Sequence, residues 1–190
     1  MDFKTYIPLA LRTAILHPSD MRRDLVHASL GMITEIGEFT TEVKRNFAYD
    51  KPIDDAMRKH MIEEIGDVQW YVPLAMAAFG IDELPFEDVG ADMDIQSAPL
   101  SDLCLFISTC ATSVHASVLF GQDSDKELVA TMLGGMIYAI DTRIAPLLGI
   151  EPGEIRQQNI DKLRKRFPDK FTPQAAEERA DKNGLPATES

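Results

Sequence analysis

Residues 32–43 read MITEIGEFTTEV, and residues 61–72 read MIEEIGDVQWYV. Both stretches repeat apolar residues at intervals of three and four, which is the spacing of one face of an α-helix. The apolar stripes are Leu25, Met32, Ile36, Val43 and Phe47 in the first helix, and Met61, Ile65, Val68, Val72 and Phe79 in the second. Because the two stripes have the same layout, we expect them to pack against each other as an antiparallel helix pair.

The same periodicity continues through most of the chain, and strand-like alternation never lasts more than a few residues. The sequence therefore predicts an all-α helical bundle built on this antiparallel pair. The predicted helices cover about 3–16, 20–48, 55–79, 101–120, 123–148 and 153–167. We expect one domain over residues 1–172. Residues 173–190 are polar and poor in large apolar side chains, so they are predicted to form a mobile tail.

Composition excludes several classes of protein. The net charge of −12 argues against binding a nucleic acid polymer, because that needs clustered basic residues. We expect no membrane span, because no apolar run reaches the roughly 18 residues that span a bilayer, and the N-terminus lacks the features of a secretory signal. Cys104 and Cys110 are read as reduced core residues, so we expect a cytoplasmic protein without a membrane partner.

Four acids form the most informative pattern in the chain. Glu35 and Glu38 flank an Ile-Gly pair on the first helix, and Glu64 and Asp67 flank another on the second. If the stripes pack as predicted, these carboxylates meet along the rim of the helix contact and repel one another. Two Mg²⁺ ions would neutralise them, with Mn²⁺ as a substitute, because hard cations prefer oxygen ligands. The alternative is a solvated acidic helix face.

Gly37 and Gly66 lie inside these acidic motifs. Each costs about 1 kcal/mol relative to alanine in a helix interior. They predict that another helix packs closely behind each acid-bearing helix, although flexible surface glycines are the alternative. Residues 132–150 can also be laid on 63–81 without a gap. Helices 101–120 and 123–148 are therefore either a degenerate second hairpin without acids or two unrelated apolar helices.

The pattern Glu35-x-x-Glu38, a gap of 25 residues and Glu64-x-x-Asp67 resembles the metal-binding motif of the MazG-like and dimeric-dUTPase-like all-α NTP pyrophosphatases. Segments 42–45, 63–71 and 159–168 extend the resemblance. It implies hydrolysis of an NTP or dNTP to the monophosphate and pyrophosphate, in nucleotide-pool control. The four acids are then the Mg²⁺ ligands, with the first two also catalytic. We expect a homodimer or higher homo-oligomer. Thr34 departs from the family, in which many members carry a further Glu.

Basic and amide side chains supply candidate substrate contacts. Asn159, Lys162 and Arg166 fall on one side of the last helix, at i, i+3 and i+7. The resemblance implies that the Asn and Lys help to hold the nucleotide, and cations suit a phosphate tail. Lys44 is a further candidate of the same kind. For all four residues, the alternative is a solvated polar face.

Two other functions compete with this interpretation. One is a di-iron carboxylate bundle, which typically needs Glu-x-x-His pairs, and neither acid pair contains a histidine. The other is a non-catalytic helical nucleotide sensor or adaptor, in which the carboxylates are only structural. His60 lies one turn before Glu64 on the same side of the helix, and it is either a neighbour of the metal ligands or an ordinary surface histidine.

Overall fold

The computed structural model describes residues 1–86, 95–119 and 126–168, and these residues form helices with no strand among them. The elements are α1 (Phe3–Leu11), α2 (Met21–Tyr49), α3 (Asp55–Phe79), α4 (Leu100–Leu119), α5 (Lys126–Ala139), the π-helical segment η1 (Ile140–Ile144), α6 (Ala145–Leu147) and α7 (Pro152–Arg166). The predicted all-α fold is confirmed. The expected tail over 173–190 and the end of the expected domain lie outside the described residues.

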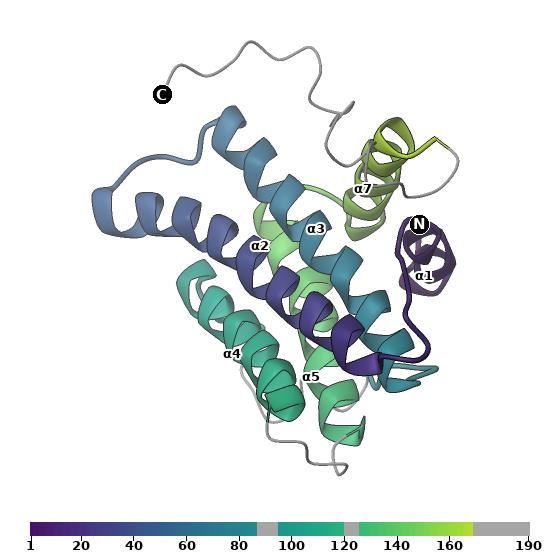
Figure 1. Cartoon of the computed structure of the whole chain (residues 1–190). Helices are drawn as coiled ribbons and strands as arrows, with labels where there is room; N and C mark the ends of the chain where they lie inside the picture. The colour runs from purple at the N-terminus through teal and green to yellow at the C-terminus, as the bar shows by residue number, and fades with distance from the viewer. Residues whose placement is uncertain (87–94, 120–125, 169–190) are drawn as a thin grey trace, which may run out of the picture.

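Local sequence signals set the ends of the two long helices. Asp20 caps α2, and the side chain of Asp54 caps α3 by accepting a hydrogen bond of 2.8 Å from the backbone of Met57. Asp50 ends α2 with a left-handed φ of 50°, and Gly80 ends α3 with a φ of 64°. The short connection after Asp50 turns the chain back, so α2 and α3 lie side by side and antiparallel (Figure 1).

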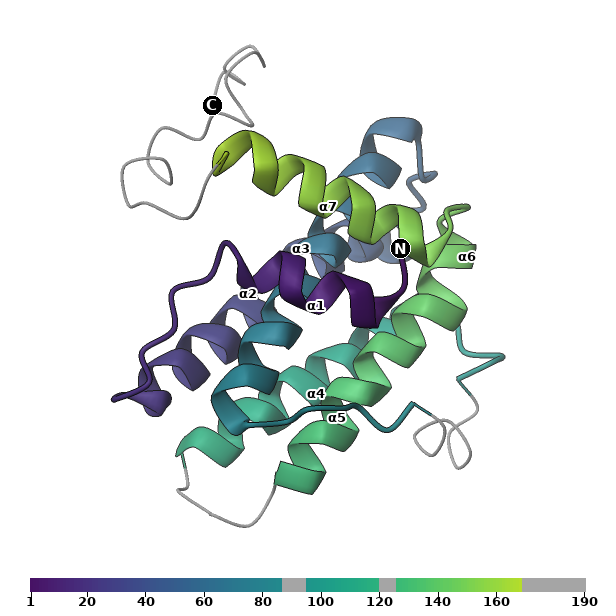
Figure 2. The ribbon, with the colours of Figure 1, turned by 90° about the vertical axis from the view of Figure 1, so that its right-hand side faces the viewer.

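The α2–α3 hairpin occupies the centre of the molecule (Figure 1). Helices α4 and α5 form a second hairpin, which packs on α2 through α4 and on α3 through α5. On the other side, α1 and α7 both pack on α3, and Figure 2 shows them in front of it. Helix α3 therefore has neighbours on most sides, and its acid-bearing face lies where α2 and α7 both approach it.

The predicted apolar stripes form most of the contact between α2 and α3. Seven of their members are buried: Met32, Ile36, Val43, Met61, Ile65, Val68 and Val72. The prediction is wrong for Phe47, whose side chain is 73% exposed. Phe47 lies in the last turn of α2, where the hairpin projects beyond the other helices, so no neighbour covers that position (Figure 1).

Helix α1 ends earlier than its periodicity predicts. It stops at Leu11, although apolar residues continue to position 16. The indole N–H of Trp70 lies 3.1 Å from the carbonyl oxygen of Ala10 and 3.0 Å from the hydroxyl of Thr13. This contact from α3 satisfies a carbonyl at the helix terminus and fixes the turn there. A tertiary contact therefore ends the helix, and no local signal announces it.

Helices α4 and α5 differ from the expectation that no apolar run is long enough to span a bilayer. The helical runs Leu100–Leu119 and Lys126–Leu147 are long and apolar enough to cross a bilayer by length and composition, contrary to the expectation from the sequence. This is weak evidence, because the core helix of a soluble protein passes the same test. Both runs pack on the α2–α3 hairpin. Cys104 and Cys110 lie on α4, free and buried as predicted.

The proposed degenerate hairpin packs as that hypothesis requires, with α4 and α5 against α2 and α3. Leu133 and Met136, which align with Glu64 and Asp67, are fully buried in the core. The face of α5 that corresponds to the acidic face of α3 is therefore covered. A common origin of the two hairpins stays a hypothesis.

Glycines mark the close approaches, but only one of the two predicted positions is involved. A Cβ on Gly66 would lie 3.4 Å from the Cβ of Asn159 on α7, which confirms the expected close packing there. A Cβ on Gly37 would meet nothing within 4 Å, so the prediction is wrong for that residue. The tightest contact is instead at Gly31, where a Cβ would lie 2.2 Å from the ring of Tyr71.

This contrast gives a matched pair of stability predictions. Gly37→Ala should stabilise the protein by up to about 1 kcal/mol, because alanine is the better helix former and the position is open. Gly31→Ala should destabilise it by about 1 kcal/mol or more, because the methyl group displaces the Tyr71 ring. Urea unfolding of both variants checks the pair. Equal effects of the same sign would mean that the helices do not approach each other closely at Gly31.

Candidate metal centre

The antiparallel packing of α2 and α3 brings the predicted carboxylates together. Oxygen atoms of Glu35, Glu64 and Asp67 all lie within 4.8 Å of one another. A second group within the same distance consists of Glu38, His60 and Glu64. Glu64 belongs to both groups, so the four acids and His60 form one continuous cluster along the edge of the hairpin.

Burial makes the charged forms of these acids unfavourable. Glu64 is only 6% exposed, and burial raises its pKa to about 8, helped by a hydrogen bond to Glu35 and by the neighbouring carboxylates. Burial also raises the pKa of Glu35, with the charges of Asp67 and Glu38 acting in the same direction. The pKa of Asp67 is raised by burial, although Lys162 opposes the shift. The cluster is therefore short of positive charge.

Helix α7 supplies a cation and an amide that contact these acids. The ammonium of Lys162 forms a salt bridge with both oxygens of Asp67 and lies 3.4 Å from Glu63. The amide nitrogen of Asn159 donates a hydrogen bond of 2.7 Å to Asp67. Asn159 and Lys162 thus lie next to the acidic face of α3, as predicted. Both side chains hold Asp67 in place, and their contact with a nucleotide stays a prediction.

Asn159 is more deeply buried than a residue at the rim of a site. It is 4% exposed, and its oxygen accepts a hydrogen bond of 2.8 Å from the hydroxyl of Tyr6. Burial raises the pKa of Tyr6 well above its ordinary value of 10. The hydroxyl therefore stays protonated and acts as the donor in its hydrogen bond to Asn159. A chain of hydrogen bonds therefore runs from α1 through α7 to Asp67 on α3, and it fixes the orientation of the carboxylate.

We expect different effects from removing these two side chains. Asn159→Ala should destabilise the protein by about 1–3 kcal/mol, because it leaves the buried hydroxyl of Tyr6 without a partner. Lys162→Ala should destabilise it less, because Asp67 keeps the hydrogen bond from Asn159 when it loses this counter-ion, but it should weaken the use of a nucleotide substrate. Denaturant unfolding and steady-state kinetics separate the two effects. Unchanged kinetics in both variants would reduce α7 to a packing element.

The remaining candidate cations differ in their position. Arg166 lies in the last turn of α7, and its charge opposes the rise in the pKa of both Asp67 and Tyr71, so it lies on the side of the acidic cluster. Its guanidinium carbon is 5.9 Å from the ring centre of Phe167. Lys44 is exposed on α2 and has no hydrogen bond or ion pair with the described residues. A role for Lys44 in substrate binding stays a prediction without structural support.

Tyr71 lies near the acids and packs within a group of aromatic side chains. Tyr71 packs edge-to-face on Trp70 with ring centres 4.8 Å apart, and on His27 at 5.7 Å. Burial raises the pKa of Tyr71 to about 12, and the charges of Glu35 and Asp67 contribute to the shift. The hydroxyl thus stays protonated next to the carboxylates. The Gly31–Tyr71 contact, which the sequence analysis did not identify, fixes this ring beside the cluster.

His60 combines features of both alternatives that the sequence leaves open for it. Its side chain is 41% exposed, as a surface histidine would be, but its Nε2 lies 3.0 Å from Glu64. The i, i+4 spacing of the two residues on α3 was visible in the sequence. The second contact of His60, to Glu42 on α2, depends on how the two helices are aligned and could not be read from either helix alone.

The donor set fits a divalent cation. Three carboxylates with raised pKa values offer oxygen atoms within 4.8 Å of one another, and the Lys162 ammonium contacts one of the three, Asp67. A hard cation would favour their charged forms and bind through oxygen, as Mg²⁺ does. The acidic cluster is therefore a candidate metal centre. No family model matches the chain, and comparisons with curated proteins and with solved structures give no match either.

Proposed function

We propose that the protein is a Mg²⁺-dependent nucleoside triphosphate pyrophosphohydrolase, which converts an NTP or dNTP to the monophosphate and pyrophosphate. The observation that carries the proposal is the cluster of Glu35, Glu64 and Asp67 with the Lys162 ammonium at its edge. Anionic ligands for a cation and a cation for a phosphate are thereby combined in one site. The resemblance to the MazG-like enzymes supports the same reaction.

The proposed roles follow from position. The four acids would hold the metal, which supplies an activated water and neutralises charge on the phosphate chain. Glu35 and Glu38 are the proposed catalytic carboxylates. Glu35 is half-buried beside Glu64 and Asp67, so it lies close enough to an ion held there to accept a proton from a water on that ion. Glu38 is exposed at the end of the cluster, where substrate and solvent have access.

Lys162 and Arg166 are proposed to bind the phosphate chain. Lys162 is largely buried and already oriented by Asp67, so little side-chain freedom is lost when it binds an anion. Arg166 lies one turn further along α7 and presents a guanidinium, which can bind phosphate oxygens in pairs. Asn159 is proposed to act mainly by fixing Asp67 and Lys162 in register.

One observation favours a second candidate function. The salt bridge between Lys162 and Asp67 already neutralises one of the acids. If the carboxylates are only structural partners of α7, the protein is a non-catalytic nucleotide sensor or adaptor. Such a protein would bind a nucleotide through Lys162 and Arg166 and release no product.

The decisive experiment is a screen of all canonical NTPs and dNTPs with detection of pyrophosphate. Mg²⁺ or Mn²⁺ should be required, and pyrophosphate should appear together with the monophosphate as the first products. Nucleotide binding without turnover of any substrate would favour the sensor. Turnover that persists in excess EDTA would exclude the proposed metal-dependent reaction.

A further inference from the structure

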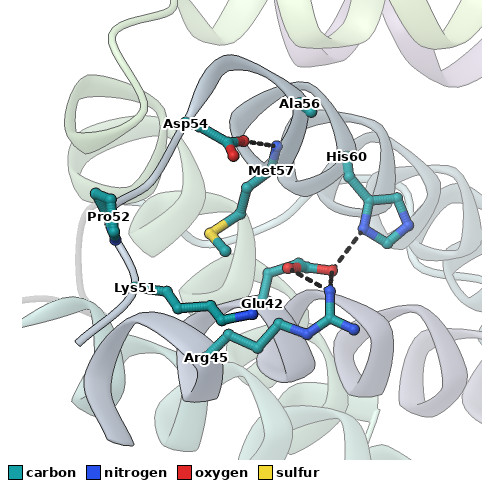
Figure 3. A pocket seen from close by; sticks show the side chains of 8 residues that line it. All are labelled: Glu42, Arg45, Lys51, Pro52, Asp54, Ala56, Met57 and His60. Carbon is teal, nitrogen blue, oxygen red and sulfur yellow. Dashed lines mark hydrogen bonds and ion pairs between the residues drawn. The ribbon is translucent and has the colours of Figure 1, made fainter. Parts of the chain in front are cut away.

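A chain of charged contacts crosses from α2 to α3 beside the acidic cluster (Figure 3). Arg45 donates two hydrogen bonds to the carboxylate of Glu42, at 2.9 and 3.1 Å. Glu42 lies 3.3 Å from the Nδ1 atom of His60, and the Nε2 atom of the same ring lies 3.0 Å from Glu64. The Nδ1 atom of the imidazole therefore contacts Glu42, which lies outside the cluster, and the Nε2 atom contacts Glu64, which belongs to it.

This arrangement is typical of a metal-binding histidine. Such a residue generally uses one ring nitrogen for the metal and gives the other to a carboxylate, which fixes the ring and raises its basicity. Glu42 is only 6% exposed, and Arg45 neutralises it. Glu42 therefore has a counter-ion of its own. It also holds the Nδ1 side of the His60 ring, so that Nε2 is directed at Glu64 in the cluster.

The two groups within the cluster differ in their donor atoms. Glu35, Glu64 and Asp67 offer oxygen alone, whereas Glu38, His60 and Glu64 offer two carboxylates and one nitrogen. Mg²⁺ prefers oxygen ligands, while imidazole suits first-row transition metals. Glu64 is shared, and a shared carboxylate can bridge two ions. The chemistry of the donors thus separates the cluster into two unequal positions.

We propose that the position formed by Glu38, His60 and Glu64 binds a first-row transition metal ion in preference to Mg²⁺, with His60 as a nitrogen ligand. Glu42 and Arg45 are positioning residues for this imidazole. The inference deepens the proposed function, because it rests on the same metal centre, but it does not depend on which nucleotide is hydrolysed. It assigns different ions to the two positions of one centre.

Space is present on the outer side of His60. A pocket of about 410 Å³ opens there, and its lining includes Lys51 from the connection and Met57 from α3 (Figure 3). The pocket lies on the Glu42 side of the half-exposed ring. On the other side, Glu38 is exposed, so an ion held by Nε2, Glu38 and Glu64 can keep water ligands there. In the close-up, the imidazole lies at one end of the pocket, and the Arg45–Glu42 pair lies between it and Lys51.

The test uses Mn²⁺ as the probe and needs no turnover. Pulsed EPR of Mn²⁺ bound to the full-length protein should detect coupling to a ¹⁴N nucleus of histidine. His60→Gln should abolish this coupling and weaken Mn²⁺ binding in calorimetry by at least about tenfold, while Mg²⁺ binding changes less than about threefold. Glu42→Gln should keep the coupling but weaken Mn²⁺ binding. His115→Gln is the matched control, since His115 contacts Ser29 and belongs to neither group.

Two results would overturn the inference. One is Mn²⁺ binding without ¹⁴N coupling, and the other is an equal loss of Mn²⁺ and Mg²⁺ affinity in His60→Gln. Circular dichroism verifies that the variants are folded, which is expected because the His60 side chain is 41% exposed. Failure of the proposed function is a separate result: the wild type would release no pyrophosphate from any nucleotide, whatever metal it binds.

Discussion

Glu64→Gln is expected to lower the rate of nucleotide hydrolysis by at least about a hundredfold, and to have the largest effect of any single substitution in the cluster. Glu64 is the one acid that belongs to both groups of candidate ligands, so its loss weakens both positions. The change removes a charge from the metal site while keeping the volume of the side chain. Glu35→Gln, Glu38→Gln and Asp67→Asn should each also cost about a hundredfold or more.

The measurement is kcat/KM for pyrophosphate release at saturating Mg²⁺, with each variant verified as folded. Glu127→Gln is the matched control, because it removes the same charge from an exposed position on α5. It should leave the rate unchanged. A wild-type rate in folded Glu64→Gln would mean that Glu64 is not a ligand of a catalytic metal ion, which would contradict the proposed site.

The fold was readable from the sequence wherever local chemistry sets an element. Asp54 caps the start of α3 and Gly80 caps its end. The apolar periodicity between these two residues can be recognised within the helix itself, without knowledge of any other element. The end of α1 was not readable, because it depends on the Trp70 indole, which arrives from a different helix. Phe47 fits the apolar periodicity of α2 and is nevertheless exposed. Periodicity predicts which face of a helix is apolar, but it does not predict how far along the helix its neighbours extend.

The candidate site shows the same division. Each acid pair was visible in its own helix, and the antiparallel packing that joins the pairs followed from their identical layout. Gly66 was correctly expected at a close helix contact, but Gly31 was missed because its partner, Tyr71, lies 40 positions away in the chain. The role of His60 depends on Glu42, and only the register between α2 and α3 brings these two residues together.

The metal-free protein is expected to lose stability as the pH rises from about 5 to about 8. The pKa of Glu64 rises from its ordinary value of 4.5 to about 8 in the folded state, and the pKa values of Glu35 and Asp67 are raised as well. Between the unfolded and folded pKa values of Glu64, the folded form binds more protons than the unfolded form. By linkage, stability is greatest at the acidic end of this window and is lost as these acids ionise.

Other groups modify this slope. Burial lowers the pKa of His27 below its ordinary value of 6.5, so near that pH the folded form binds fewer protons at His27 than the unfolded form does. This contribution opposes the loss of stability with rising pH in the acidic part of the range. Burial raises the pKa of Asp141, which acts in the same direction as the cluster at low pH. The comparison between wild type and Glu64→Gln removes both contributions, because they are the same in the two proteins. The difference in slope belongs to the cluster.

Mg²⁺ should reverse the loss, because it binds the ionised carboxylates of the folded state. At a concentration about a hundred times its Kd, it should raise the melting temperature at pH 8 by roughly 5–10 °C. The shift should shrink toward pH 5, where protons compete for the same oxygens. The measurement is melting temperature at pH 5, 6.5 and 8, in EDTA and in Mg²⁺, for wild type and Glu64→Gln. If Mg²⁺ shifts both proteins equally, the ion binds elsewhere, and the acids are not a preassembled metal centre.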